Sequence, residues 1–410
     1  MGSPATTTSA PIPYDRRLVA LLSVGQLITW GSVFYIFALL MEPVERELGL
    51  GRAQSSLAFS LALLAEGVLA WPVGRWIDRG HERAVMTGGS LLIGVGLLLH
   101  SFIDSAAAFY AVWLLLGSAL AATLYNPVFA IVTRRFPHDF RRAIITLTFL
   151  GGLASTVFIP LGAWLIAQLG WRHALWVLAA IHLFVCVPLH AQVLRHAPKP
   201  AHRPASGAAA TTRPAAHYLR SVPFLMVGLF TVLLMAVTAA LPPHMVSLLR
   251  GAGLPEAWAI AVPASIGLVQ VLGRVLLFFF EHHFDLHLAN RVIPCLIPLG
   301  LVTLIAGAGH PGAALWFVLF YGMGNGMLTI VKGTAIAQYV NREHVATLNG
   351  ALGLPSAIAR ALAPLLLGLL WTPAGGYTSG LWILLVASVI AVFALLGAQR
   401  WRLRLRPGVS

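Results

Sequence analysis

The sequence predicts an all-α membrane protein whose twelve transmembrane helices form two pseudo-symmetric halves of six. Of its 410 residues, 58% are hydrophobic and only 10% are charged, whereas soluble domains carry about 25% charged residues. The apolar runs reach the length of about 20 residues that spans a bilayer as a helix. One long polar stretch, 195–219, divides these runs six and six and has the Ala- and Pro-rich composition of a flexible linker.

The apolar runs also define the domain organisation. We expect a disordered N-terminal tail at 1–17, a first half at 18–194, the linker at 195–219, a second half at 220–399 and a basic tail at 400–410. The predicted spans are 18–41, 56–77, 84–103, 106–133, 143–169, 171–194, 221–249, 258–280, 292–308, 313–338, 347–371 and 380–398.

The basic residues indicate the orientation in the membrane. Lys and Arg cluster in the short loops on the side of both termini and the linker, while the opposite loops carry only Arg46, Arg52, Arg172 and Arg250. By the positive-inside rule, both termini and the linker are therefore cytoplasmic. This clustering accounts for the formal net charge of +14, so no nucleic-acid partner is expected. The first 13 residues lack an apolar core, and we expect no cleavable signal peptide.

A weak internal repeat relates the two halves at an offset of 204 residues. Glu66, in the first half, lands on Gln270 in the second. The identical positions are Tyr14 and Tyr218, Met41 and Met245, Gly49-Leu50 and Gly253-Leu254, and Ala53 and Ala257. Two halves with such symmetry are typical of secondary transporters.

The second predicted span carries an unusual charge and ends in an unusual motif. Glu66 is the only Asp or Glu inside any predicted span. A carboxylate at mid-membrane costs about 2.5–3.5 kcal/mol on insertion scales, which marks it as a functional candidate. The span ends in Gly74-Arg75-Trp76-Ile77-Asp78-Arg79-Gly80-His81-Glu82-Arg83.

This charged end resembles the loop after the second helix in the major facilitator superfamily, G-x-L-x-D-R-x-G-R-[RK]. The matching residues are Gly74, Asp78, Arg79 and Arg83; Trp76, His81 and Glu82 depart from the pattern, and Gly80 stands one place early. The resemblance implies that the first, fourth, seventh and tenth spans line a central cavity. It also implies that the second span packs near the eleventh and the fifth near the eighth, with Asp78 pairing across the halves. The alternative is a helix end that matches by chance.

The eighth span contains Gln270-Val271-Leu272-Gly273-Arg274-Val275, which resembles the monocarboxylate-transporter branch and its bacterial relatives. There an Arg in this helix pairs with the substrate carboxylate, which implies a substrate-binding role for Arg274. Animal members carry an Asp one turn earlier, where this chain has Gln270, and a Lys in the first span, which this chain lacks. A proton relay through that Asp therefore does not carry over. The alternative for Arg274 is a side chain that snorkels to the nearby helix end.

Polar residues in three other spans are further candidates. Asn325, Thr329 and Lys332 share one helical face in a glycine-rich tenth span, suited either to ligand binding or to helix packing. The fourth span holds Tyr125 and Asn126 beside Pro127, which frees a backbone carbonyl that neighbouring groups must satisfy. We name Arg274, Gln270, Asn325, Lys332, Tyr125 and Asn126 as substrate-binding candidates.

Histidines, cysteines and cofactor motifs add little to these candidates. His244 follows Pro242-Pro243 near the outer mouth and is a candidate gate, a proton carrier or a simple interfacial histidine. Cys186 and Cys295 lie in apolar spans and are expected to be free thiols. Nucleotide, metal and nucleophile motifs are absent, so we expect neither an enzyme nor a cofactor, and the pair His282-His283 is expected to be solvated. Gly152, Pro160 and Gly162 overlap only partly with the antiporter motif of drug exporters.

The charges inside the spans predict the substrate class. Arg274, Lys332 and Arg360 outnumber Glu66, and buried charges are normally paired. Glu66 and Arg360 lie at equal depth on spans that the resemblance packs together, so we predict an ion pair; otherwise Glu66 is protonated and Arg360 faces a wet cavity. The two remaining cations predict a small organic anion, a carboxylate, moved by a secondary transporter.

Two other functions remain open at this point. The first is a proton-antiport exporter of drugs or metabolites, in which Glu66 would carry the proton, and the second is a non-transporting receptor or assembly factor. Symport of protons with the anion also remains open. For each of these functions we expect a monomer in the lipid bilayer, at the plasma membrane and specifically at the inner membrane of a bacterium.

Overall fold

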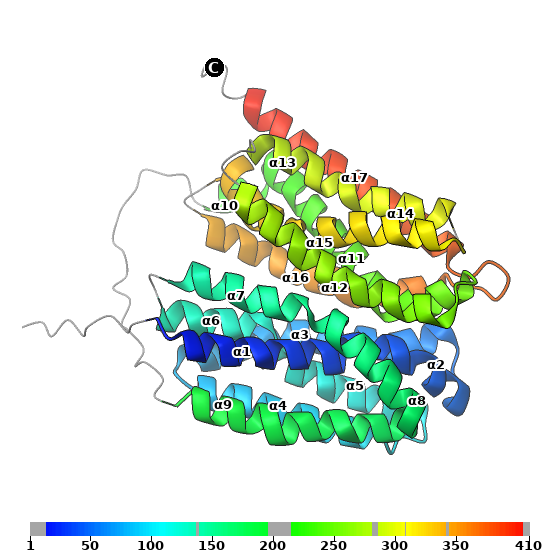
Figure 1. The fold of residues 1–410 in the computed structure, drawn as a ribbon. Coiled ribbons are helices and arrows are strands. Elements are labelled where there is room, and N and C mark those ends of the chain that lie inside the picture. The colour runs from blue at the N-terminus through cyan, green and yellow to red at the C-terminus, as the bar shows by residue number, and fades with distance from the viewer. Residues whose placement is uncertain are drawn as a thin grey trace, which may run out of the picture.

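The computed structural model describes residues 14–136, 139–195, 215–280, 286–307, 309–341 and 344–404, and their regular elements are helices. The helices form two groups that lie side by side, with the first half below the second in Figure 1. The first half comprises α1 (Arg16–Thr29), η1 (Trp30–Tyr35), α2 (Phe37–Leu48), α3 (Arg52–Asp78), α4 (Glu82–His100), α5 (Ala106–Ala121), α6 (Tyr125–Arg135), α7 (Phe140–Gly152), α8 (Ala154–Ile181), η2 (His182–Cys186) and α9 (Val187–Val193). The second half comprises α10 (Ala215–Leu219), α11 (Val222–Gly251), α12 (Glu256–Phe280), α13 (Leu286–Val292), η3 (Ile293–Cys295), α14 (Leu296–Ala306), α15 (Pro311–Tyr339), α16 (Val345–Leu369) and α17 (Thr378–Arg404).

These helices make up twelve transmembrane spans. Ten helical stretches of the described chain are long and apolar enough to cross a membrane. One of them, Arg142–Val193, changes direction at Gly170, whose φ of 77° only glycine adopts readily, and it therefore contains two spans. The helix α15 supplies the twelfth. The predicted fold class is confirmed.

The internal repeat is visible in the backbone where the first span of each half ends. Gly49 and Gly253 both take left-handed conformations, with φ of 65° and 85°. The next residue donates in the same way in each half: Leu50 N–H bonds to the Glu45 carbonyl at 3.0 Å, and Leu254 N–H to the Leu249 carbonyl at 3.2 Å. Both are helix C-caps made by a glycine, so the aligned Gly-Leu pairs end the corresponding helix of each half in the same way.

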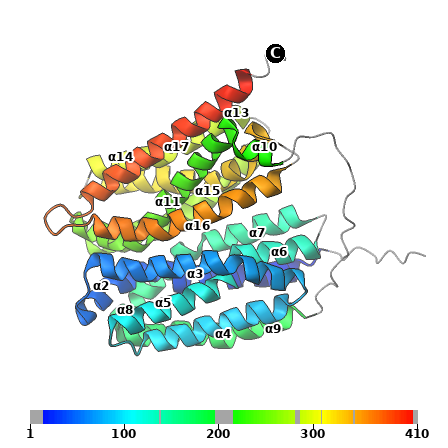
Figure 2. The ribbon, with the colours of Figure 1, turned by 180° about the vertical axis from the view of Figure 1, so that it is seen from behind.

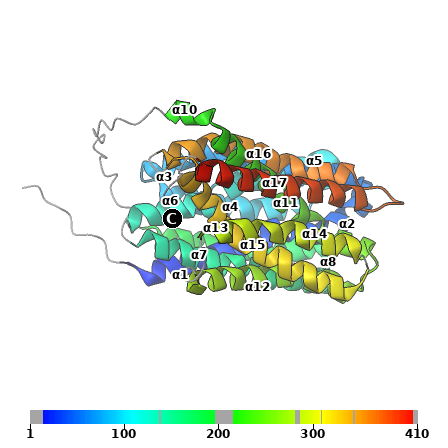
Figure 3. The same cartoon turned by 90° about the horizontal axis from the view of Figure 1, so that it is seen from above.

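The two halves meet along two helix pairs that the family resemblance predicted. The helix α3 packs against α16, while α7 and α8 pack against α12. Each half also has an apolar core of its own, built mostly from its own helices. Toward the end of the molecule that carries the linker, the helices of the second half tilt away from those of the first (Figure 2). We call this the linker end and the other the distal end; Figure 3 shows the two halves from above.

Several predicted continuous spans are interrupted in the structure, and two of these interruptions bear on the candidate site. The first contains the π-helical segment Trp30–Tyr35, and the fourth breaks between Ala121 and Tyr125. The break places Pro127 in the first turn of α6, where its missing N–H costs no helical bond. The freed Thr123 carbonyl accepts a hydrogen bond of 2.5 Å from the Gln26 side-chain amide, as the sequence analysis required of some neighbouring group.

Some predicted features fall outside the described residues. They are the tail at 1–13, most of the linker, His282 and His283, and the end of the chain after 404. Both cysteines are free thiols as predicted, with Cys186 buried and Cys295 half-buried.

Candidate functional site

Glu66 and Arg360 form an ion pair halfway along the seam between α3 and α16. Arg360 Nη2 lies 3.0 Å from Glu66 Oε2, and the two side chains are 20% and 6% exposed. The structure therefore contains the predicted pair, and its geometry does not fit the alternative of an Arg360 that stands alone. Each charge offsets the other in a setting where a single one would be costly.

The polar contacts of α3 with the second half lie only on the distal side of this pair. Ser60 Oγ accepts a hydrogen bond of 3.1 Å from the Leu365 backbone N–H, and Ser56 Oγ lies 3.4 Å from His244 Nε2. The two helices also approach closely at Gly67, since a Cβ there would meet Ala357. Beyond it, no hydrogen bond of α3 to the described residues of the second half remains. The seam is therefore bonded at the distal end and unbonded at the linker end.

Arg274 reaches across to both halves from α12. Its Nη1 donates to the Thr148 carbonyl of α7 at 2.5 Å, and its Nε donates to the Gly326 carbonyl of α15 at 3.3 Å. Its guanidinium is also close enough to the Tyr125 side chain to interact with it electrostatically. This side chain is held inside the protein, so the snorkelling alternative does not describe it. Carbonyl and hydroxyl partners leave its charge uncompensated.

Lys332 lies in the same region, on α15. Its Nζ lies 2.9 Å from the Sδ atom of Met235 on α11, and a thioether is only a weak acceptor. It is near enough to Arg274 and Arg360 to feel their charges. Among the described residues, no carboxylate forms an ion pair with Arg274 or Lys332. We call Arg274, Lys332 and the Glu66–Arg360 pair the central cluster. With Lys332 protonated, the cluster holds three positive charges and one negative charge.

Aromatic side chains from the first half face the central cluster. Trp30 stacks near Tyr125 and Tyr35, with ring centroids 5.1 and 6.5 Å away, and Tyr35 interacts electrostatically with Arg274. The Nε1–H of Trp30 is buried and has no acceptor in the described chain. The π-helical segment positions Trp30 and Tyr35 together, and such segments often occur at functional sites. No residue pattern predicts a role for Tyr35, because a π-helix leaves no residue signature.

The other predicted binding residues are less directly placed. Gln270 is buried and lies one helical turn before Arg274 on α12. A Cβ added to Gly326 of α15 would clash with the Gln270 backbone, so α12 and α15 approach closely at this point. Asn325 is half-buried and Asn126 is exposed. Neither asparagine side chain hydrogen-bonds another described residue in this conformation.

The predicted motif after α3 is held within the first half. Gly80 takes a φ of 92°, so it makes the tight turn one position before the family's glycine. Arg83 Nε donates to the Ala191 carbonyl at 2.7 Å, while Asp78 and Arg79 are exposed. Asp78 has no polar partner among the described residues in this conformation, so its pairing with the second half stays a prediction for the conformation in which the linker end is closed.

Glu82, which the sequence analysis noted only as a departure from the motif, makes the stronger contacts. It is fully buried and pairs with Arg134 and Arg135, the latter donating through Nε at 2.6 Å. A basic residue at this position would repel both arginines. The departure is therefore matched by two arginines at the end of α6, which fixes the motif loop against the first half.

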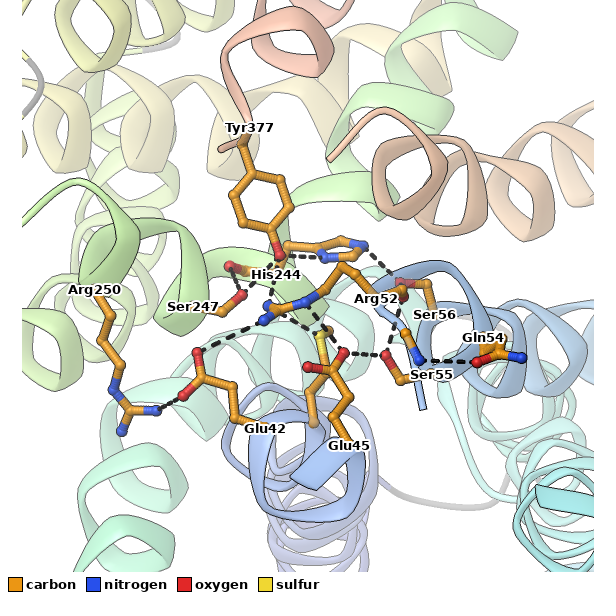
Figure 4. Close-up of polar contacts among 12 residues, drawn as sticks. Glu42, Glu45, Arg52, Gln54, Ser55, Ser56, His244, Ser247, Arg250 and Tyr377 are labelled. Carbon is orange, nitrogen blue, oxygen red and sulfur yellow. Dashed lines mark hydrogen bonds and ion pairs between the residues drawn. The ribbon is translucent and has the colours of Figure 1, made fainter. Parts of the chain in front are cut away.

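His244 lies at the distal end in a fully buried network (Figure 4). Its Nδ1 is 3.0 Å from the Tyr377 hydroxyl, and its Nε2 is 2.9 Å from the Pro364 carbonyl. It is therefore not an exposed interfacial histidine. Instead it connects α11 to α16 and to the loop before α17, beside Ser56 of the first half.

Arginines and glutamates surround this histidine and join the halves (Figure 4). Arg52 pairs with Glu45 at 3.1 Å and donates to the Tyr377 hydroxyl at 2.8 Å. Arg250 lies 2.6 Å from Glu42 of the first half and also pairs with Glu256 of its own half. We call Glu42, Glu45, Arg52, His244, Arg250 and Tyr377 the distal latch.

Sequence analysis used Arg52 and Arg250 only to orient the chain. The signal that could have found the latch is the scarcity of basic residues on this side. Three of the four, Arg52, Arg172 and Arg250, form ion pairs with glutamates there.

A cavity of about 430 Å³ lies behind the latch in the second half. Its lining includes Leu249, Leu304, His310, Trp371 and Tyr377 and contains no Asp, Glu, Lys or Arg. It is therefore a poor candidate for a charged ligand, and the central cluster remains the candidate binding site.

Comparison with known proteins agrees with this architecture. The family model described as Major Facilitator Superfamily matches residues 22–284. Monocarboxylate transporter 13 from Bos taurus is 31% identical over 321 residues, which cover 75% of this chain and 72% of the cattle protein. The Rattus norvegicus protein of the same name is 36% identical over 121 residues, 28% of each chain.

Solved structures show the same fold at low identity. A point mutant of the nucleoside transporter NupG has a TM-score of 0.73 at 16% identity, covering 93% of this chain and 98% of that one. A bacterial homolog of the human lysosomal transporter Spinster, in an inward-facing and unoccupied conformation, has a TM-score of 0.72 at 16% identity, with coverage of 96% and 98%.

The fold and the comparisons define a multi-pass membrane transporter rather than an enzyme. The chain belongs to the major facilitator superfamily.

Proposed function

We propose that this transporter moves a small organic anion, a carboxylate, which binds at the central cluster. The observation that carries the proposal is that Arg274 and Lys332 have no carboxylate partner among the described residues, although both are part-buried and Arg274 bonds both halves. An anion supplies the missing charge, and the planar guanidinium suits a carboxylate. The similarity to proteins named monocarboxylate transporter supports the same substrate class.

Transport is proposed to follow alternating access between the halves. The distal latch and the distal part of the α3–α16 seam hold one end shut, while the linker end lacks such bonds in the described residues. The bias of Lys and Arg places the linker end in the cytoplasm, at the plasma membrane and, by the resemblance to bacterial relatives, at a bacterial inner membrane. The structure then represents a conformation that opens inward. When the linker end closes, Asp78 would come within reach of the start of α16.

The orientation can be tested by labelling. With Cys186 and Cys295 replaced by serine, a cysteine at Ser206 in the linker is expected to react with an impermeant reagent only from the cytoplasmic side. Labelling from outside in intact cells would overturn the orientation and, with it, the inward-opening assignment.

The substrate proposal can be tested by uptake into proteoliposomes. Wild-type protein is expected to accumulate at least one member of a panel of labelled carboxylates, such as lactate, pyruvate and benzoate, and to ignore lipophilic cations. Arg274→Ala loses two charge-assisted contacts of about 1.5–3 kcal/mol each, so uptake is expected to fall about a hundredfold or more.

Two further variants sharpen this test. Arg274→Lys is expected to fail nearly as badly as Arg274→Ala, because lysine cannot bind a carboxylate bidentately. Arg75→Lys is the matched control, since Arg75 is exposed and stacks on Trp71 at the linker end, 4.7 Å from the ring. Full uptake by Arg274→Lys, or transport of cations instead of carboxylates, would contradict the proposal.

A further inference from the structure

The cavity behind the distal latch lies among the loops that connect α11 to α12, α14 to α15 and α16 to α17. We call it the distal cavity. Its volume of about 430 Å³ falls in the range of roughly 300–1,000 Å³ that is usual for small-molecule sites. The rim is exposed and includes Gly251, His310 and Gly375, while the floor is buried and includes Leu304 and Ala314. The distal cavity is therefore open to a molecule that approaches from the distal side.

The internal repeat shows which side chains occupy the corresponding place in the first half. At the offset of 204 residues, Gly375 and Gly376 correspond to Trp171 and Arg172. The Arg172 guanidinium lies 4.4 Å from the centroid of the Trp171 ring and 2.6 Å from a Glu47 carboxylate oxygen. The Trp171 Nε1–H also donates to Glu47, at 2.9 Å. We call Trp171 and Arg172 the first-half plug.

The residues that hold the first-half plug also have counterparts around the distal cavity. Arg172 donates to the backbone carbonyls of Ser101 and Ile103 at the end of α4. The counterparts of Glu47, Ser101 and Ile103 are Gly251, Ile305 and Gly307, and each of these three lines the distal cavity. Glycine has no side chain that could fill the space. The second half therefore has an open volume where the first half has an aromatic ring and a guanidinium.

The missing groups indicate the chemical class of a ligand. Trp371 and Tyr377 supply aromatic walls, on which another aromatic ring packs favourably. The last carbonyls of α14 offer hydrogen-bond acceptors, as those of α4 do for Arg172. A charge is disfavoured, because Gly251 replaces the carboxylate of Glu47 and the lining has no Asp, Glu, Lys or Arg. The cavity therefore suits an uncharged aromatic molecule that donates hydrogen bonds.

Two side chains of the cavity lining also hold Arg52 of the first half. The guanidinium carbon of Arg52 lies 5.1 Å from the Trp371 ring centroid and 5.8 Å from that of Tyr377, within the range of a cation–π contact. The loop between the two rings is closed by Thr372 and Gly376, whose backbone N–H groups each donate to the other's carbonyl, at 3.2 and 2.8 Å. A molecule packed against both rings in the cavity keeps them where they contact Arg52.

We propose that the distal cavity binds a small uncharged aromatic molecule that donates hydrogen bonds, and that this ligand holds the distal latch closed. The ligand packs on Trp371 and Tyr377 in the positions that they take while Arg52 lies against them. It therefore has a higher affinity for the conformation with the distal end shut, and it shifts the population toward that conformation. The site differs in place and in preferred charge from the central cluster, so binding there does not depend on the proposed substrate.

Titration calorimetry on the purified full chain tests the site, with tryptophol and tryptamine as probes. Both have an indole ring, but tryptophol ends in a hydroxyl and tryptamine in an ammonium. Tryptophol is expected to bind saturably at one site, and tryptamine at least about tenfold more weakly, because the cavity has no group that balances its charge. Absence of saturable tryptophol binding, or equal affinity for the two probes, would overturn the proposal.

A matched pair of variants locates the binding. Gly251→Trp places a ring at the position that corresponds to Glu47, and is expected to weaken tryptophol binding at least about tenfold by filling the cavity. Gly312→Trp is the control, since Gly312 is not part of the cavity lining. A Cβ added at either glycine meets no neighbouring atom within 4 Å, so both variants are expected to fold. Equal tryptophol affinity in the two variants would show that the probe binds elsewhere.

A second measurement follows the distal latch and needs no cavity-filling variant. Tryptophol is expected to slow the labelling of a cysteine at Ser247 from the distal side by about threefold or more, because it favours the shut conformation. Arg52→Gln removes the guanidinium that the two rings hold, so tryptophol is expected to bind this variant without changing its labelling. Arg172→Gln, which alters an arginine of the first-half plug, is expected to keep the response. Unchanged or faster labelling of the otherwise wild-type protein would overturn the action of the ligand on the latch.

Discussion

The distal latch and the central cluster are both built from arginines near the seam between the halves, but they differ in how their charges are balanced. In the latch, Arg52 and Arg250 each have glutamate partners within the protein. In the central cluster, only Arg360 has one. A self-balanced network can open and close without a ligand, whereas a network with unbalanced cations is completed by an anion. We propose that this difference separates a gate from a binding site.

The largest effect is expected in the central cluster, at Glu66 and Arg360. Removing one partner of a buried pair typically costs about 3–5 kcal/mol, while replacing both can be nearly neutral. Glu66→Gln and Arg360→Gln are each expected to impair folding or transport, as measured by thermal unfolding and carboxylate exchange. The double variant, and the exchanged pair Glu66→Arg with Arg360→Glu, are expected to recover part of the loss. Purely additive losses would mean that the two charges do not act as a pair.

A smaller effect is expected at the centre of the latch. The Tyr377 hydroxyl contacts His244, Arg52 and Ser247. Tyr377→Phe leaves the buried His244 nitrogen without this partner, which costs about 1–3 kcal/mol. We expect lower thermal stability and faster labelling of a cysteine at Ser247 from the distal side.

Tyr110→Phe provides the matched control for this substitution. The Tyr110 hydroxyl makes no hydrogen bond with the described residues, so both readouts are expected to stay at wild-type values. If Tyr377→Phe behaves like Tyr110→Phe, then the Tyr377 hydroxyl does not hold the distal end closed.

Partly exposed ion pairs of the latch are expected to matter less for stability than for conformation. Such pairs contribute about 0.2–1 kcal/mol. Arg250→Gln breaks a pair between the halves, so distal labelling at Ser247→Cys is expected to rise severalfold with little loss of thermal stability. Arg172→Gln breaks a pair with Glu47 inside the first half and is expected to leave labelling unchanged. Equal labelling in the two variants would show that the latch does not depend on contacts between the halves.

The smallest effect on stability is expected at Asp78, which is exposed in this conformation. Asp78→Asn is expected to change the unfolding free energy by no more than about 0.5 kcal/mol, as for other exposed positions. Carboxylate exchange is nevertheless expected to slow, because the closed linker end would use this carboxylate. Wild-type exchange rates in Asp78→Asn would remove Asp78 from the mechanism.

The sequence was sufficient to predict the spans, the two halves and the seam. Long apolar runs have few alternatives to a membrane helix, and Glu66 and Arg360 lie at equal depth on helices that the family packs together. The Gly49 and Gly253 caps confirmed the repeat because their conformation follows from glycine itself. These predictions depend on periodicity and depth, which the order of residues along the chain determines.

Other features could not be predicted, for physical reasons. The latch joins helix ends, where short loops set distances that hydropathy does not encode. The π-helical turn at Trp30–Tyr35 is a shift in hydrogen bonding with no residue signature. Asp78 illustrates a third reason, because its proposed partner belongs to a conformation that differs from the one in the structure.

The most direct test of the central claim is stabilisation of the purified protein by ligands. Thermal unfolding is measured in the presence of a panel of small carboxylates and of lipophilic cations, for wild type and for Arg274→Gln. The uncompensated charge of Arg274 and Lys332 predicts that one or more carboxylates raise the unfolding temperature of wild type, that this rise is lost in Arg274→Gln, and that cations have no effect. Stabilisation by lipophilic cations, or by carboxylates equally in both proteins, would contradict an anion site at the central cluster.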